Sequence, residues 1–311
     1  MANQSEEGLK TAYNLLEKGN PVEAKKILAD ICEFNLENPE IDFAIWCCSF
    51  WIDFFKHLPN LDSYERGERL IFQWKSFENS LLQKKQIFQR AVFSVQNGVF
   101  KLALKDFSFQ PVDDIQNIVQ RAEIYFKLGI CQKKLGNYTD SLSYLKKTNL
   151  LIQGQSGVIA EMADCYALCG KEKQAKVLFR EAFYIDAKKI DLNLLDSALI
   201  KCLIEKVKQK GYKGEELQYW VPVFGVLYGV LTVSRELRSQ EAGKLKQDIF
   251  ELEVEIKNPA NNIKILKPKL MFHYFRLMDY YVQKNETGSS INELKLKIKL
   301  LDSQIFELYN K

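Results

Sequence analysis

Few side chains in this sequence belong to the types that carry out acid–base catalysis. The 311 residues contain only two histidines. His57 follows Asp53 by about one helical turn, but Pro59 lies close behind it, so a capping or surface role at a helix end is expected. His273 stands among aromatic residues, where a partly buried packing role is expected. Neither histidine nominates a catalytic acid or base.

Glycine-rich phosphate loops are also absent from the sequence. Neither the GxxxxGK(S/T) pattern nor the GxGxxG pattern occurs, so no nucleotide cofactor is expected. The run Gly154-Gln-Ser156-Gly157 looks superficially like the turn around a nucleophilic serine, but it lacks the spacing and the preceding strand of that motif. These features predict a protein that is not an enzyme and takes no cofactor.

The cysteines do not form a recognisable metal-binding pattern. Cys165 and Cys169 lie one helical turn apart and could hold half of a zinc site, but no second Cys/His pair at comparable spacing completes it. Most of the seven cysteines lie in apolar helical patterns, as small buried residues in a reducing cytoplasm would. The first seven residues have neither the basic start nor the apolar core of a secretory signal. We therefore expect no metal and a cytoplasmic location.

Basic residues gather in one segment near three aromatic residues. They are Lys201, Lys206, Lys208, Lys210 and Lys213, close to Tyr212, Tyr219 and Trp220. Basic side chains interleaved with aromatic rings are typical of nucleic-acid contacts. A solvated helix face with cations near its carboxyl end explains the same residues. Because the net charge is only +4, nucleic-acid binding through Lys201–Lys213 is the less favoured alternative, and no nucleic-acid partner is expected.

Long helices dominate the expected structure. The chain has only 15 Gly and 7 Pro, too few for a turn-rich β-fold of this length. Residues 41–55 are nearly apolar all round and predict a fully buried helix. Apolar residues at alternating steps of four and three predict another long helix over about 80–105. Both belong to an irregular stretch at 41–110, which lacks a clear repeat.

Two expected helix ends, at Gly136 and Gly170, lie 34 residues apart. Apolar residues recur at helical intervals from 114 to 135, and a second helix follows directly after Gly136. Thirty-four residues is the length of one helix–turn–helix unit of a tetratricopeptide array. The spacing therefore predicts stacked helical pairs.

On these residues the chain resembles the tetratricopeptide repeat (TPR) family. The clearest units cover 114–187 and 8–33. Small residues in such units let paired helices approach closely, and large ones fill the gaps beside them. The repeat signature consists of Gly129, Gly136, Ala163, Tyr166, Gly170, Ala175, Phe179 and Ala182, while Ser141 stands where the family usually has Ala. The resemblance implies an all-α fold, with a TPR-like α-solenoid over residues 1–211.

TPR proteins present a groove, lined by the first helix of each unit, to a peptide or helix of another protein. By resemblance, the partner-binding groove would include Glu123, Phe126, Ile130, Lys133, Lys134 and Asp164. Phe126 and Ile130 would offer apolar anchors, and the two lysines could pair with carboxylates of the partner. The alternative is that these side chains pack against other helices of the chain. The implied function is a protein–protein interaction adaptor or scaffold.

Residues 212–311 form a helical C-terminal region without the 34-residue period. Its apolar segment 219–233 is too short and too interrupted by Pro and Gly to span a bilayer. It would be either a buried connection or a surface for a membrane or an assembly partner, with Trp220 and Tyr228 at the interface. In 290–309, apolar residues step by three and four like a heptad seam, which predicts packing on the protein's own helices or self-association. A peripheral membrane or complex-assembly factor is thus the alternative function.

Overall fold

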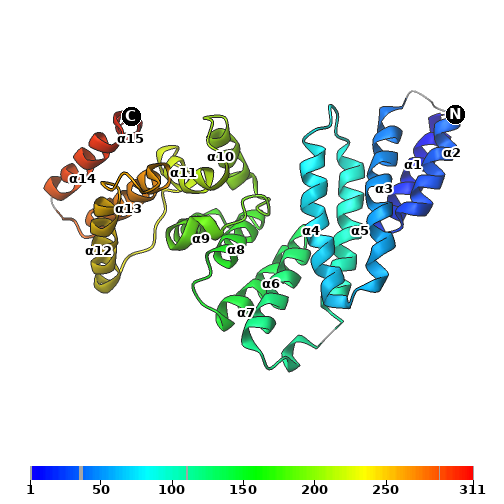
Figure 1. The fold of residues 1–311 in the computed structure, drawn as a ribbon, viewed down its shortest axis with the longest axis horizontal. Coiled ribbons are helices and arrows are strands. Elements are labelled where there is room, and N and C mark those ends of the chain that lie inside the picture. Colours follow the sequence, from blue (N-terminus) through cyan, green and yellow to red (C-terminus); the bar gives the residue numbers. More distant parts are fainter. Residues whose placement is uncertain (1, 35–37, 110, 287, 311) are drawn as a thin grey trace. The chain divides into compact units, whose positions relative to one another are not determined.

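The computed structural model describes residues 2–34, 38–109, 111–286 and 288–310. Within these ranges the chain forms fifteen α-helices and three short 3-10 turns, and it contains no strand (Figure 1). It divides into two compact units, Met1–Ile152 and Gln153–Lys311. The predicted all-α helical repeat array is confirmed. None of the helices in the described ranges is both long enough and apolar enough to cross a lipid bilayer.

The first unit is built around one central helix. Its helices are α1 (Ala2–Glu17), α2 (Pro21–Phe34), α3 (Pro39–His57), α4 (Ser63–Leu81), α5 (Gln89–Phe107), α6 (Ile118–Lys134) and α7 (Tyr138–Leu151). Helix α5 packs against α1, α3, α4 and α6, while α1 pairs with α2 and α6 pairs with α7. Buried aromatic rings of Trp51, Trp74, Phe77 and Phe100 form much of the core. Contacts between these rings join α3, α4 and α5 in the core.

The irregular part of this unit differs from the sequence prediction in two respects. The helix expected over 80–105 begins only at Gln89, because the preceding chain is solvent-exposed at Leu82 and Ile87 and has no core to hold it in a helix. Helix α3 was expected to be buried on every side. Trp51 is buried, but Trp46 and Phe50 are only half-buried.

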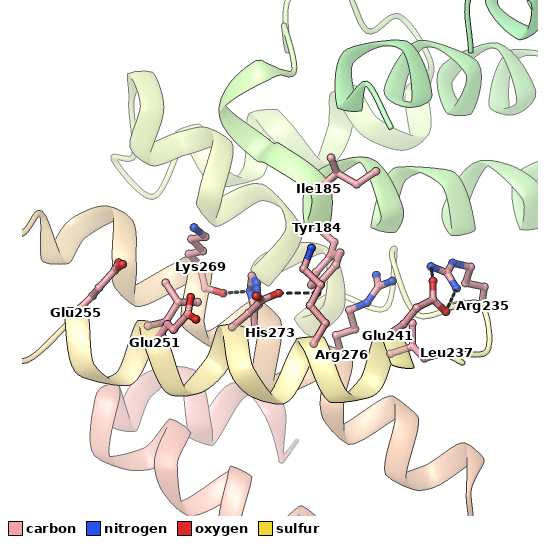
Figure 2. Close-up of a pocket in the computed structure, with 13 residues that line it drawn as sticks. Tyr184, Ile185, Arg235, Leu237, Glu241, Glu251, Glu255, Lys269, His273 and Arg276 are labelled. Atoms are coloured by element: carbon pink, nitrogen blue, oxygen red, sulfur yellow. Dashed lines mark hydrogen bonds and ion pairs between the residues drawn. The ribbon is translucent and has the colours of Figure 1, made fainter. Parts of the chain in front are cut away.

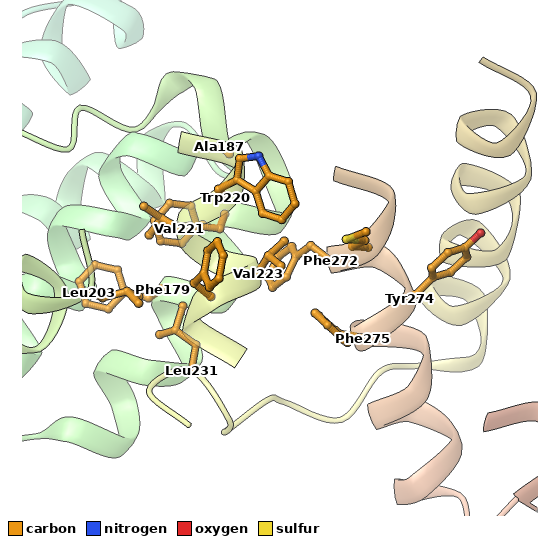
Figure 3. Packing of buried hydrophobic residues seen from close by; sticks show 14 of the residues in the cluster. Phe179, Ala187, Leu203, Trp220, Val221, Val223, Leu231, Phe272, Tyr274 and Phe275 are labelled. Carbon is orange, nitrogen blue, oxygen red and sulfur yellow. The ribbon is translucent and has the colours of Figure 1, made fainter. Parts of the chain in front are cut away.

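The second unit holds the C-terminal eight helices. They are α8 (Ser156–Leu168), α9 (Glu172–Asp186), α10 (Ala198–Lys208), α11 (Gly214–Leu227), α12 (Ser239–Glu255), α13 (Ile263–Gln283), α14 (Gly288–Leu301) and α15 (Ser303–Tyr309). Helix α11 packs on α9, α10 and α13, and α13 also packs on α12 and α14. Figure 3 shows the shared core, with Phe179, Leu203, Trp220 and Phe272 contributed by four different helices. The boundary at 211/212 suggested by the sequence falls inside this unit, where α10 packs on α11.

The turns between paired helices share one backbone geometry. Gly19, Gly136 and Gly170 end α1, α6 and α8 with φ values of 73°, 82° and 74°. At each turn the following N–H bonds the carbonyl five residues back, as from Asn137 to Gln132 at 2.9 Å and from Lys171 to Tyr166 at 2.8 Å. This is the helix-ending arrangement that glycine adopts without steric cost. The 34-residue spacing therefore reflects a repeated helix–turn–helix unit.

Close helix approach accounts for most of the signature residues. A Cβ at Gly129 would lie 2.9 Å from Cγ of Leu145, so glycine lets this leucine of α7 pack closely on α6. The hydroxyl of Ser141 donates to the carbonyl of Gly129 at 2.7 Å, which explains how serine replaces alanine there. Between α8 and α9, four signature residues are fully buried: Ala163, Ala175, Phe179 and Ala182. Tyr166 is half-buried.

The apolar segment 219–233 is part of the core of the second unit. Trp220 and Phe224 are 4% and 2% exposed, Tyr219 is half-buried, and Tyr228 is exposed at 38%. Most of the large side chains of this segment therefore pack against neighbouring helices, while Tyr228 and Val233 are exposed.

The heptad-like segment 290–309 does not form one continuous helix. Helix α14 ends at Leu301, and Asp302 accepts the N–H of Ile305 at 3.0 Å to start α15. Asp302 also pairs with Lys267 of α13 at 2.7 Å. The seam residues Leu294, Ile298 and Ile305 are buried, and α14 packs on α13. The seam is thus used for packing within the unit.

Candidate functional site

The predicted groove residues lie mostly in the interior. Ile130, Lys133 and Lys134 are 1%, 2% and 4% exposed, Phe126 is half-buried, and Glu123 is exposed. Asp164 is fully buried. Its carboxylate accepts the N–H groups of Asp196 at 2.7 Å and Ser197 at 2.8 Å, which ties α8 to the backbone just before α10. Four of the six side chains therefore have no surface to offer a partner.

A cleft of about 540 Å³ opens elsewhere, wholly within the second unit. Its walls come from the end of α9, the connection between α11 and α12, and the facing sides of α12 and α13 (Figure 2). A second hollow of about 300 Å³ adjoins it and shares Tyr184, Ile185, Lys269 and His273 with it. The two hollows adjoin each other within this unit, and we take the first as the candidate site.

Arg276 is the most unusual side chain in the cleft, because it is charged, only 4% exposed and incompletely hydrogen-bonded. Its Nη2 bonds both carboxylate oxygens of Glu181, at 2.7 Å and 2.9 Å. The guanidinium carbon lies 3.9 Å from the centre of the Tyr184 ring. Within the described residues, Nε and Nη1 have no hydrogen-bond acceptor. Both nitrogens are themselves closed off from solvent, so this cation is held by Glu181 and by the Tyr184 ring.

Ion pairs fasten the α11–α12 connection over one end of the cleft. Arg235 forms an ion pair with Glu181 at 3.0 Å. It also donates hydrogen bonds to both carboxylate oxygens of Glu241, at 2.6 Å and 2.9 Å. Glu241 also accepts the N–H of Arg238 at 2.8 Å. The hydrogen bond from Arg235 is the main reason that the pKa of Glu241 falls to about 2. Glu181 therefore joins two arginines that are far apart in the sequence.

His273 and Tyr184 form the divide between the two hollows. The Nδ1 of His273 lies 2.7 Å from the carbonyl oxygen of Lys269, so this nitrogen carries the proton. The rings of His273 and Tyr184 lie 5.0 Å apart, and the Tyr184 hydroxyl donates to Asp248 at 3.3 Å (Figure 2). Burial lowers the pKa of His273 to about 4. The imidazole is thus neutral near pH 7.

Acidic side chains line the other end of the cleft. Asp248, Glu251 and Glu255 recur at helical intervals along α12, and the cations Lys244 of α12 and Lys269 of α13 also line the cleft. Glu251 and Glu255 are exposed, and in the described ranges neither makes an ion pair. No group of three or more His, Cys, Asp or Glu in the described chain could hold a metal ion. The arrangement suits the binding of a polar ligand with charges of both signs.

We expect His273 to make folding stability depend on pH between about 4 and 6.5. Its pKa is about 4 in the folded protein, and a histidine in an unfolded chain titrates near 6.5. The unfolded chain therefore takes up the proton first as pH falls. The contribution of neutral His273 to the free energy of unfolding is therefore fully present above pH 6.5 and is lost as the pH falls toward 4. Lowering the pH from 7 to 5 should cost about 2 kcal/mol.

Urea unfolding at both pH values, in the wild type and in His273→Asn, measures this effect. The asparagine amide retains a donor for the Lys269 carbonyl but does not titrate. The variant should therefore lose about 2 kcal/mol less than the wild type over this pH range. An identical pH response in the two proteins would show that His273 becomes charged within the folded state.

The sequence did not single out Arg235 or Arg276 as functional residues. One signal was present, since Arg276 interrupts an apolar and aromatic run in the segment expected to form α13. A charged residue on a face that must be buried indicates either an ion pair or a ligand. Glu181, the partner of Arg276, lies 95 residues earlier in the sequence. The residues around Glu181 do not indicate that it pairs with an arginine so far along the chain.

Similarity to known proteins does not assign a role to this cleft. No protein-family model matches the chain, and no curated protein matches it.

Proposed function

We propose that this protein is a non-enzymatic interaction adaptor of TPR-like architecture, and that the cleft of its second unit receives a peptide segment of a partner protein. The observation that carries the proposal is the cleft itself. Its volume is typical of pockets that enclose a small ligand or a short peptide segment. Its lining carries charge of both signs, from the cations Lys244, Lys269 and Arg276 and from the carboxylates Glu241, Asp248, Glu251 and Glu255. A peptide has the polar groups to match such a surface.

The alternatives have weaker support. A membrane-associated role through 219–233 would need the buried Trp220 and Phe224 to become exposed. The lysines of Lys201–Lys213 are exposed, but most have partners within the chain. Lys201 and Lys208 pair with carboxylates, while Lys206 and Lys210 lie over aromatic rings. The adaptor proposal needs neither the exposure of Trp220 and Phe224 nor the release of these lysines from their partners.

A cytoplasmic location remains part of the proposal. All seven cysteines lie in the described residues, and none of them forms a disulfide. Free thiols, several of them buried, support a reducing compartment.

Affinity purification with charge-swapped bait tests the docking site. The cleft variant carries Lys244→Glu and Glu251→Lys, which exchange one exposed charge of each sign and leave the net charge unchanged. The matched control carries Lys173→Glu and Glu205→Lys, which are exposed and lie outside the cleft. We expect a partner that the wild type and the control retain and that the cleft variant loses at least about tenfold. Equal recovery with all three baits would contradict docking in the cleft.

A further inference from the structure

Two helices of the second unit carry rows of large apolar side chains that are exposed on the described chain. On α12 these are Phe250 and Val254, which are 66% and 53% exposed. On α14 they are Leu296 and Leu300, which are 56% and 79% exposed. In each pair the two residues lie four positions apart, about one turn along the helix, so they share one side of it. Exposed apolar side chains that gather in this way indicate a surface that binds another molecule.

The two rows border the same hollow. Helices α12 and α14 both pack on α13 (Figure 1), and a hollow of about 220 Å³ is lined by all three helices. Phe250 lines it from α12, and Glu293 lines it from α14. Leu296 and Leu300 follow Glu293 by three and seven residues, so they lie on the same side of α14 as this glutamate. The two apolar rows therefore form the walls of one groove over α13, which we call the α12–α14 groove.

The carboxylates of the α12–α14 groove already have a cation beside them. Glu253 of α12 and Glu293 of α14 both bond Lys297, at 3.0 Å and 3.3 Å. Glu253 also accepts the hydroxyl of Tyr274 at 2.8 Å. These contacts join the two walls of the groove, and they leave its acids less able to attract a cation of a ligand.

Two cations at the α12 row are not neutralised in this way. Lys246 lies four residues before Phe250, and its ammonium stands 5.2 Å from the centre of the Tyr281 ring. Lys257 lies in the turn that ends α12, where its N–H bonds the carbonyl of Val254 at 3.2 Å. Both lysines are exposed, and among the described residues neither forms an ion pair. The apolar row of α12 thus has an available cation near each end.

An amphipathic helix with acidic residues has the chemistry that these features require. Such a helix presents apolar side chains at intervals of three and four, which suits a groove between two helices. Acidic residues beside its apolar face would pair with Lys246 and Lys257. A second copy of the groove would instead bring the same unpaired lysines against each other, and like charges repel. A bilayer surface would have to cover a hollow that contains the carboxylates of Glu253 and Glu293.

We propose that the α12–α14 groove docks an acidic amphipathic helix of a partner protein. Its apolar contacts are made by Phe250, Val254, Leu296 and Leu300, and its charge preference is set by Lys246 and Lys257. The groove is separate from the cleft, because Phe250 lines the hollow beside α14 whereas Lys244 and Glu251 of α12 line the cleft. The proposal goes beyond the peptide site of the cleft and gives the protein a second docking surface.

Selection from a display library of helical peptides on the full-length protein tests the apolar part of the proposal. We expect enriched peptides with apolar residues at intervals of three and four and with Asp or Glu beside them. The variant Phe250→Gln/Leu300→Gln should weaken binding of a selected peptide by at least about tenfold. Both side chains are exposed, so folding should be unaffected. The matched control Phe72→Gln, which replaces an exposed apolar residue of α4, should leave the affinity unchanged.

Charge reversal tests the acidic preference separately. The variant Lys246→Glu/Lys257→Glu should weaken binding of the selected peptide about tenfold. The same variant should bind more tightly than the wild type a version of the peptide in which Lys replaces each Asp and Glu. The cleft variant Lys244→Glu/Glu251→Lys should bind the selected peptide as the wild type does.

Three results would overturn the proposal. The first is that no helical peptide is enriched, or that binding of the enriched ones does not change in Phe250→Gln/Leu300→Gln. The second is that the wild type binds the acidic and basic versions of the peptide equally. The third is that Phe250→Gln/Leu300→Gln abolishes dimerisation in sedimentation, or binding to vesicles of phosphatidylcholine and phosphatidylserine, which would assign the groove to a second copy or to a membrane. The cleft is tested by its own variant, so it stands or falls independently of these results.

Discussion

Replacing Asp279 with alanine should lower the free energy of unfolding of the second unit by about 3 kcal/mol. Asp279 of α13 pairs with Arg180 of α9, whose side chain is only 1% exposed. Arg180 has one other acceptor, the carbonyl of Thr232 at 3.4 Å, and its Nε has none in the described residues. Removing Asp279 leaves a buried guanidinium without a counter-ion. The expected loss of unfolding free energy lies at the lower end of the range for breaking a buried ion pair, because the Asp279 side chain is 33% exposed.

A surface pair and a double variant make this prediction specific. Glu205 and Lys208 pair at 2.8 Å, but their side chains are 61% and 45% exposed. Glu205→Ala should therefore cost less than about 1 kcal/mol. The double variant Arg180→Met/Asp279→Leu should recover much of the stability that Asp279→Ala loses, because no unpaired charge remains buried. Urea unfolding followed by far-ultraviolet circular dichroism measures all three. A cost below 1 kcal/mol for Asp279→Ala would mean that Arg180 finds another partner or reaches water.

Gly98→Ala should destabilise the first unit by about 3 kcal/mol, the upper end of the range for overpacked cores. Gly98 lies on α5 where this helix meets α1. An added Cβ would stand 2.0 Å from the carbonyl oxygen of Leu16 and 3.2 Å from the backbone nitrogen of Gly19. Because these atoms belong to the backbone, relief requires the helices to move apart, and α5 also contacts α3, α4 and α6.

Two other glycines provide controls for this effect. At Gly129 the nearest atoms belong to the side chain of Leu145, which can shift, so Gly129→Ala should cost less than Gly98→Ala. Gly243 lies within α12 with no atom within 4 Å of an added Cβ. Gly243→Ala should raise stability by about 0.5–1 kcal/mol through helix propensity. Thermal unfolding of the three variants gives the order of their stability changes. Equal stability changes for Gly98→Ala and Gly243→Ala would refute the close approach of α1 and α5.

The same ion pairs that stabilise the second unit also hold the walls of the cleft. Arg180–Asp279 and Arg276–Glu181 both join α9 to α13, and Arg235 joins the α11–α12 connection to α9 and α12. A cleft whose walls are fixed before binding loses less conformational freedom when a ligand enters. The charges therefore give the proposed peptide site a preformed shape.

Features that depend on short-range physics could be predicted from the order of residues along the chain. Apolar periodicity predicted the helices around Gly136 and Gly170, and the spacing of these two glycines predicted the repeated turn. Both residues adopt the left-handed backbone conformation that ends a helix. Such features depend on residues within one or two helical turns, so they can be read from the chain directly.

Which side chains are covered, and which come together in the cleft, depends on how the helices pack in three dimensions. Lys133 and Lys134 follow the pattern of an exposed groove, yet both are buried. The cleft depends on Glu181, Arg235 and Arg276, which come from α9, a connection and α13. Burial and ion pairing of polar groups are set by the helices that cover them. Those contacts join segments far apart in the chain, and no local pattern of residue types specifies them.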